Sequence, residues 1–105
     1  MATLETLNEI ANSFLPNQHV EVGKWFGKPS LKSQNKFFIV LWGKDLAFKL
    51  TGPPHAKALA LPGARLFDPR GQGHAMKEWV HVDVTDTSVL QELAQSAFAY
   101  AVEQS

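Results

Sequence analysis

The chain has 105 residues, enough for one domain with a single hydrophobic core and too few for two. Hydrophobic residues make up 45% and charged residues 19%, a balance that excludes an intrinsically disordered chain. The formal net charge is zero, which disfavours a partner selected by charge alone, such as nucleic acid or an anionic membrane. The absence of cysteine excludes disulfide scaffolds, thiol catalysis, zinc–thiolate sites and iron–sulfur clusters.

The N-terminal segment and the apolar runs bear on location. Glu5 and Glu9 stand where a secretory signal would carry Lys or Arg. The longest apolar run, residues 37–42, is far shorter than the roughly 20 residues that span a bilayer. We therefore expect a soluble, cytoplasmic protein with no membrane partner.

The first third of the chain predicts a helix and the start of a sheet. Residues 3–15 place apolar side chains at helical spacing, with Thr3 as a candidate cap and Pro16 as the stop. Residues 20–28 predict irregular structure or a short strand. Residues 29–33 predict a weak strand that turns at Gln34-Asn35 into the β-branched and aromatic strand 37–42.

The rest of the chain continues the sheet and ends in a helix. A short Gly-containing turn joins strand 37–42 to the alternating strand 45–51 as a hairpin, and Gly52-Pro53-Pro54 then opens a short helix. Strands 64–67 and 77–84 flank a loop at 68–74, and Asp86 or Thr87 caps a long final helix. The order α-β-β-β-α-β-β-α predicts an α+β fold in one domain, 1–105, with a two-layer antiparallel sheet and helices on one face.

Several blocks of sequence, in this order, resemble the N-terminal domain of the TfoX competence regulators over residues 20–104. They are Phe26-Gly27-Lys28-Pro29, Lys36-Phe37-Phe38 running to Leu41-Trp42-Gly43, Phe48-Lys49-Leu50, Leu61-Pro62-Gly63-Ala64 with Phe67, Gly73 to Met76-Lys77-Glu78-Trp79-Val80, and a closing helix with Phe98 and Tyr100. The resemblance implies a two-layer α+β fold like that of secretion chaperones. It also implies a regulatory role in the transcription of competence genes, together with a cyclic-AMP receptor protein. Full-length regulators carry a second, helical domain that these 105 residues do not include, and the family supplies no catalytic residues.

The aromatic strand 37–42 is apolar on both faces. Simple alternation places Phe38, Val40 and Trp42 on the face that helices on one side of the sheet cannot cover. With Trp79 nearby, this face predicts an interface with a second copy or a protein partner. The alternative is that segments 20–28 and 68–77 fold over it. We take Phe38, Val40, Trp42 and Trp79 as the interface candidates.

The charges are unevenly distributed. All ten Lys and Arg residues lie within residues 22–77, where only Asp45 and Asp68 oppose them, so the middle carries +8 and the flanks −8. Lysines that alternate with aromatic residues suit sequence-independent nucleic-acid binding. Solvated lysines that protect a sheet edge explain the same pattern, and we favour that interpretation. The candidates for anion or nucleic-acid contact, including those of the Gly-rich loop 70–77, are Lys24, Lys28, Lys32, Lys36, Arg70, His74 and Lys77.

The histidines give little support for catalysis or metal binding. His19, His55, His74 and His81 have no metal-ligand spacing, so we predict no metal, no cofactor and no catalytic residue. His81 and Asp83 share a strand face, as an acid–base pair or, as we favour, a solvated pair. The sequence thus predicts a small non-enzymatic regulatory domain that binds a protein partner or a second copy of itself. Nucleic-acid association and an anion-binding protein or enzyme using loop 70–77 are the alternatives.

Overall fold

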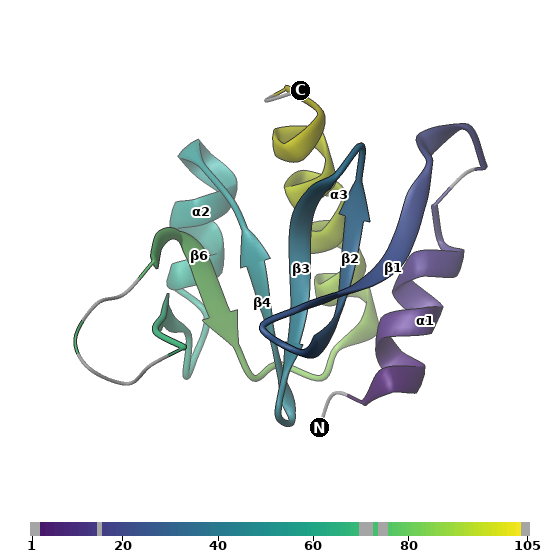
Figure 1. Cartoon of the computed structure of the whole chain (residues 1–105). Coiled ribbons are helices and arrows are strands. Elements are labelled where there is room, and N and C mark those ends of the chain that lie inside the picture. Colours follow the sequence, from purple (N-terminus) through teal and green to yellow (C-terminus); the bar gives the residue numbers. More distant parts are fainter. Residues whose placement is uncertain (1–2, 15, 70–72, 74–75, 104–105) are drawn as a thin grey trace.

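The computed structural model describes residues 3–14, 16–69, 73 and 76–103, and Figure 1 shows their arrangement. The elements in chain order are α1 (Leu4–Asn12), the 3-10 helix η1 (Pro16–Gln18), β1 (Val20–Trp25), β2 (Lys28–Ser33), β3 (Lys36–Trp42), β4 (Asp45–Lys49), α2 (Gly52–Leu59), β5 (Arg65–Phe67), β6 (Met76–Val82) and α3 (Thr87–Glu103). The predicted α+β class is confirmed. The order is α-β-β-β-β-α-β-β-α, because segment 20–25 forms a full strand where the sequence indicated irregular structure or a short one.

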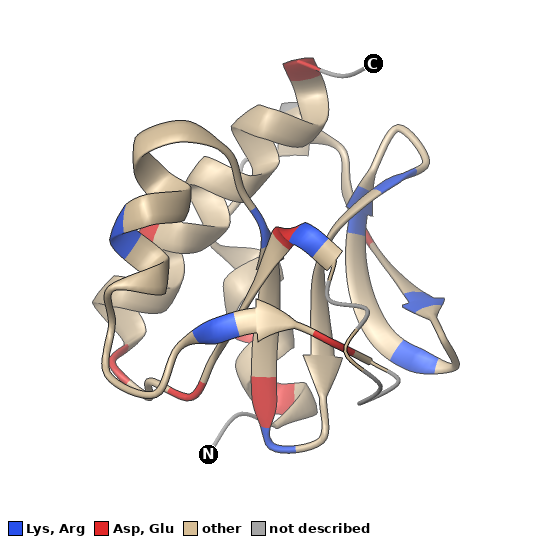
Figure 2. Cartoon of the chain, turned by 90° about the vertical axis from the view of Figure 1, so that its left-hand side faces the viewer, with Lys and Arg blue, Asp and Glu red and all other residues tan. Residues whose placement is uncertain are grey.

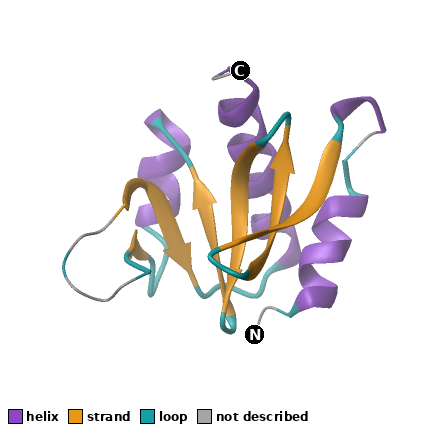
Figure 3. Ribbon diagram, in the orientation of Figure 1, coloured by secondary structure: helices purple, strands orange, loops and turns teal. Residues whose placement is uncertain are grey.

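The strands form one antiparallel sheet in the order β1-β2-β3-β4-β6-β5. Its helix-side face packs against α1, α2 and α3, which share a single core with the sheet (Figure 3). That core buries the apolar residues of the helices, among them Leu7, Ile10, Ala58, Leu90, Leu93 and Ala97. None of the helices in the described ranges is long and apolar enough to cross a membrane.

Local polar contacts explain where the first and last helices begin. The Thr3 hydroxyl accepts a hydrogen bond from the Thr6 backbone N–H at 3.3 Å, as expected for a helix cap. Asp86 Oδ1 accepts from the N–H groups of Ser88 and Val89, at 2.9 and 3.3 Å. Both predicted caps are confirmed, and each satisfies N–H groups that have no partner within the helix.

Two-residue turns connect the first strands. Gln34 and Asn35 join β2 to β3 with φ angles of 52° and 66°, and Phe26 and Gly27 join β1 to β2 with 56° and 72°. Two positive φ angles in succession match the hairpin turn whose twist suits antiparallel strands. The predicted turn at Gln34-Asn35 is confirmed. The turn at Phe26 is unexpected, because Phe is a poor residue for left-handed backbone.

A β-bulge in β3 changes which aromatic side chains face the helices. Leu31 pairs with Ile39 and Lys32 pairs with Phe37, so Phe38 is an extra residue between them. Phe38 lies in the helix-side core, with its ring 5.9 Å from Phe14 and 5.8 Å from Phe98. The predicted alternation is therefore wrong at this point: Phe38 faces the helices, and Phe37 takes its place on the other face.

The face opposite the helices, here called the concave face, carries a second core. This inner cluster consists of Val40, Ala47, Phe67 and Trp79, with exposed fractions of 0–4%. The ring of Trp25 in β1 lies 4.5 Å from that of Trp79 in β6 and 6.3 Å from that of Phe67 in β5. The sheet therefore curls so that β1 reaches across the concave face. Of the two interpretations left open by the sequence, the one in which segment 20–28 covers this face describes the fold.

Candidate binding surface

Four partly exposed aromatic residues border the inner cluster and form what we call the aromatic rim: Trp25, Phe26, Phe37 and Trp42. Phe26 is 51% exposed, and the other three are half-buried. The ring of Phe26 lies 4.5 Å from that of Trp25 and 5.9 Å from that of Trp42, while Trp25 stacks on Phe37 at 6.1 Å. The rim is thus a continuous set of rings whose positions are fixed by one another.

Phe26 occupies an unusual backbone position at the tip of the β1–β2 hairpin. Its φ of 56° lies in the left-handed region, where the Cβ of a bulky residue costs about 1–2 kcal/mol. Gly or Asn would fill the same turn position with less strain. An exposed aromatic side chain is therefore held at a position where the fold itself would favour a smaller residue.

The structure brings only some of the predicted cationic residues to the rim. The Nζ atoms of Lys28 and Lys32 each lie 5.7 Å from a ring centroid, that of Trp42 and that of Phe37. Lys24 is adjacent to Trp25 in β1 and so points to the opposite face, and Lys36 is exposed at the start of β3. Figure 2 shows several Lys or Arg positions, in blue, on the strands at the right of the view, away from the helices.

The remaining cationic candidates lie elsewhere. Lys77 is exposed on β6, and its carbonyl oxygen lies 2.8 Å from His55 Nε2. Arg70 and His74 lie outside the described residues. An ion pair joins the acidic C-terminal flank to the basic middle: Lys57 Nζ lies 2.5 Å from Glu92 Oε1 of α3.

Most of the predicted interface residues are covered by the chain itself. Phe38 lies among the helices, and Val40 and Trp79 are buried beneath the rings of β1 and β5. Among the four candidates, only Trp42 reaches the surface. The prediction of a wide apolar face is therefore corrected to a narrower rim, because the hairpin at 20–28 removes the centre of that face from solvent.

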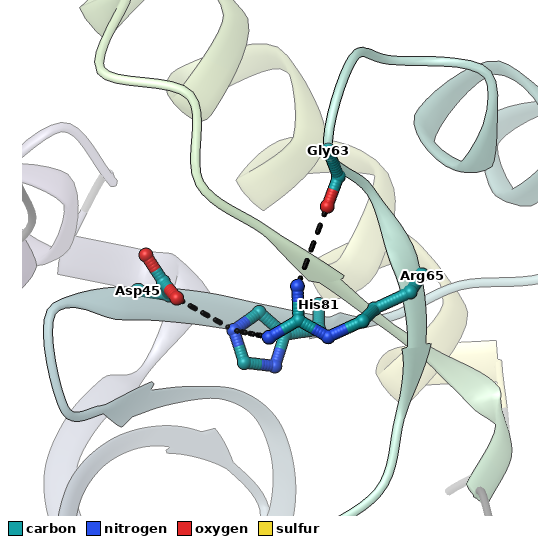
Figure 4. Close-up of polar contacts among 4 residues, drawn as sticks. All are labelled: Asp45, Gly63, Arg65 and His81. Carbon is teal, nitrogen blue, oxygen red and sulfur yellow. Dashed lines mark hydrogen bonds and ion pairs between the residues drawn. The ribbon is translucent and has the colours of Figure 1, made fainter.

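A polar cluster that the sequence did not indicate lies near Trp42 of the rim, and Figure 4 shows its side chains. His81 Nε2 in β6 lies 2.8 Å from Asp45 Oδ2 at the start of β4 and 3.4 Å from Arg65 Nη2 in β5. The side chains of His81 and Asp45 are only 8% and 15% exposed. The sequence predicted Asp83 as the neighbour of His81, but the Asp83 carboxylate packs against Gly63. A Cβ atom built on Gly63 would lie only 2.7 Å from Asp83 Oδ1. Asp45 becomes the partner of His81 because β4 pairs with β6. The pattern of residues within one strand cannot reveal a partner that lies on another strand.

Two adjoining hollows surround this cluster. The larger, of about 670 Å³, is lined by Trp42, Lys44, Asp45, Arg65 and His81, among others. The smaller, of about 410 Å³, shares Lys44, Asp45 and Arg65 and adds Asp83. Since Trp42 belongs to both the rim and the larger hollow, the two features form one continuous surface. The described residues contain no group of three or more His, Asp and Glu side chains arranged to hold a metal ion.

We compared the chain with protein families, curated proteins and solved structures. No protein-family model, curated protein or solved structure matches the chain.

Proposed function

We propose that the chain is a small non-enzymatic binding domain, similar to the N-terminal domain of TfoX competence regulators, that binds a protein partner through the aromatic rim in a regulatory role. The observation that carries the proposal is Phe26, which is 51% exposed and adopts a left-handed φ of 56°. A residue that costs stability and exposes an aromatic ring to water is best explained by a contact with another molecule.

The neighbourhood of Phe26 suits protein recognition. Aromatic residues are enriched at the centres of protein interfaces, and they contribute most when their positions are fixed before binding. Trp25 and Trp42 hold the Phe26 ring from two sides. Lys28 and Lys32 border the rings with charge, as the polar rim of an interface does.

Single-stranded nucleic acid is the second candidate, and one observation favours it. Lys28 and Lys32 lie over ring faces of the aromatic rim, and sequence-independent binding of single strands combines such cations with stacking platforms. Against it, Glu21 pairs directly opposite Lys32, and Lys24 faces away from the rings. Two lysines supply little of the phosphate neutralisation on which nucleic-acid affinity depends.

The test is photocrosslinking from the rim in the producing cell. A benzophenone amino acid replaces Phe26, which keeps an aromatic group at the hairpin tip, and the matched control carries it at Val102, a 39% exposed residue of α3. The proposal expects one discrete protein adduct from position 26 and none of that mass from position 102. An adduct with nucleic acid would support the second candidate. Equal labelling from both positions, or no adduct from position 26, would contradict the proposed surface.

A further inference from the structure

The larger hollow beside the aromatic rim has the size and lining of a small-molecule site. Its volume of about 670 Å³ falls in the range of roughly 300–1,000 Å³ that is usual for such sites. Its lining includes Lys44 of the β3–β4 turn, Asp45 at the start of β4 and Arg65 of β5. His81 also lines the hollow, and only 8% of its side chain is exposed.

The acidic groups of this hollow already have partners. Asp45 Oδ2 lies 2.8 Å from His81 Nε2, and Asp68 Oδ2 accepts a hydrogen bond from the Gly73 N–H at 3.0 Å. Both carboxylates of the hollow therefore already have hydrogen-bond partners within the protein. The first contact also fixes Asp45 against His81 of β6.

The cationic groups of the hollow lack an acidic partner among the described residues. The described contacts of the Arg65 guanidinium are with the Gly63 carbonyl oxygen at 3.5 Å and His81 Nε2 at 3.4 Å, both long for hydrogen bonds. Lys44 is exposed and forms no ion pair with a described carboxylate. An Arg–carboxylate or Arg–phosphate pair would form two short, charge-assisted bonds in place of these weak contacts.

The lining of the hollow also includes the apolar side chains of Trp42 and Leu66. The ring of Trp42 makes an edge contact with that of Phe67 at 5.1 Å. A ligand that matches this lining carries an oxyanion for Arg65 and Lys44 and a hydrocarbon or ring portion for Trp42 and Leu66. We propose that this hollow binds a small organic oxyanion, a carboxylate or a phosphate monoester, with Arg65 as the main contact.

This site is separate from the predicted anion candidates of loop 70–77, since it uses Arg65 and Lys44. It goes beyond the proposed function and does not depend on it. Because Trp42 belongs to both surfaces, a bound oxyanion would alter the edge of the aromatic rim.

The test is a titration of ¹⁵N-labelled protein followed by two-dimensional NMR, with benzoate and phenyl phosphate as probes and benzyl alcohol as their uncharged counterpart. The proposal expects saturable shifts at the Trp42 indole N–H and at the backbone N–H groups of Lys44 and Arg65 with one or both anions. Benzyl alcohol should shift them little. The more effective anion identifies the preferred oxyanion.

The variants Arg65→Gln and Lys24→Gln distinguish anion binding at this site from a general effect of the protein's charge. Loss of one charge-assisted contact should weaken binding about tenfold or more in Arg65→Gln. Lys24→Gln removes an equal charge from an exposed position on β1 and should leave affinity unchanged. The same spectra report whether each variant is folded, and Arg65→Lys, which retains the charge, should bind with intermediate affinity. The proposal is overturned if neither anion produces saturable shifts, or if Lys24→Gln weakens binding as much as Arg65→Gln.

Discussion

Trp25 in β1 and Trp79 in β6 lie with ring centroids 4.5 Å apart and planes inclined by 25°, although three strands separate them in the sheet. This contact exists because the sheet curls and closes its concave face with its own first hairpin. The closure has two consequences. It buries most of the apolar face that the sequence indicated as an interface, and it places Phe26 at the surface beside Trp42.

The inner cluster should contribute strongly to stability. Phe67 is fully buried and contacts the rings of Trp25, Trp42 and Trp79. Phe67→Ala should therefore lower the free energy of unfolding by about 3–5 kcal/mol, measured by denaturant titration. Val22→Ala, at a 53% exposed position of β1, should change it by less than about 0.5 kcal/mol. Equal effects of the two substitutions would show that the concave face is open in solution.

The bulge in β3 can be tested by energetic coupling. Phe38 and Phe14 meet edge to face at 5.9 Å on the helix side. A double-mutant cycle with Phe14→Leu and Phe38→Leu should give a coupling energy of about 0.5–1.5 kcal/mol. Phe37 faces the other side of the sheet, so the cycle of Phe14→Leu with Phe37→Leu should give a value close to zero. Coupling of Phe14 to Phe37 instead would restore the simple alternation.

Phe26 should be a residue at which function opposes stability. Asn tolerates left-handed backbone, so Phe26→Asn should raise the free energy of unfolding by about 0.5–1 kcal/mol. The same substitution should abolish binding of the partner identified by crosslinking. Thermal unfolding and a binding assay on one preparation measure both effects. A loss of stability above about 1 kcal/mol would mean that the ring is retained for packing against Trp25 and Trp42.

The single tyrosine of the chain offers a clean titration. The Tyr100 hydroxyl donates a hydrogen bond to Glu78, and that bond, with burial and the carboxylate charge, raises the pKa of Tyr100 above its usual value of 10.0. The resulting stabilisation is fully present below pH 10 and is lost as the pH rises through the pKa of the folded protein. Phenolate absorbance against pH measures this pKa.

Removing the acceptor should reverse that shift. Glu78→Ala should return the pKa of Tyr100 toward 10.0, because the hydrogen bond is the largest cause of its rise. Glu92→Ala removes a carboxylate that pairs with Lys57 and should leave the Tyr100 titration unchanged. If both variants titrate like the unaltered protein, the contact between α3 and β6 does not exist in solution.

Local sequence signals predicted most of the elements, and long-range contacts account for what they missed. Thr3, Asp86 and Gln34-Asn35 act within a few residues, so the helix caps and the β2–β3 turn could be predicted. The bulge at Phe38 could not, because it depends on the register with β2. The alternation of β3 gave no sign of it.

The site was harder to predict than the fold for the same reason. Lys28 could be named from its aromatic neighbours, but its position over Trp42 depends on how β2 and β3 pair. The partner of His81 is 36 residues away, at Asp45. The sequence favoured a solvated pair of His81 with Asp83, whereas the structure buries His81, and a buried polar group requires a partner. The sequence pattern indicated neither that burial nor that partner.

The most direct test of the central claim is an isotope-filtered NMR experiment on an equal mixture of labelled and unlabelled protein. It separates proton contacts within one molecule from contacts between copies. The curled sheet predicts nuclear Overhauser effects between the Trp25 and Trp79 indole rings within one molecule, with intensities independent of protein concentration. If these effects appeared only between copies, the first hairpin would be exchanged between two molecules. The concave face would then be a dimer interface rather than a core that leaves the aromatic rim free for another partner.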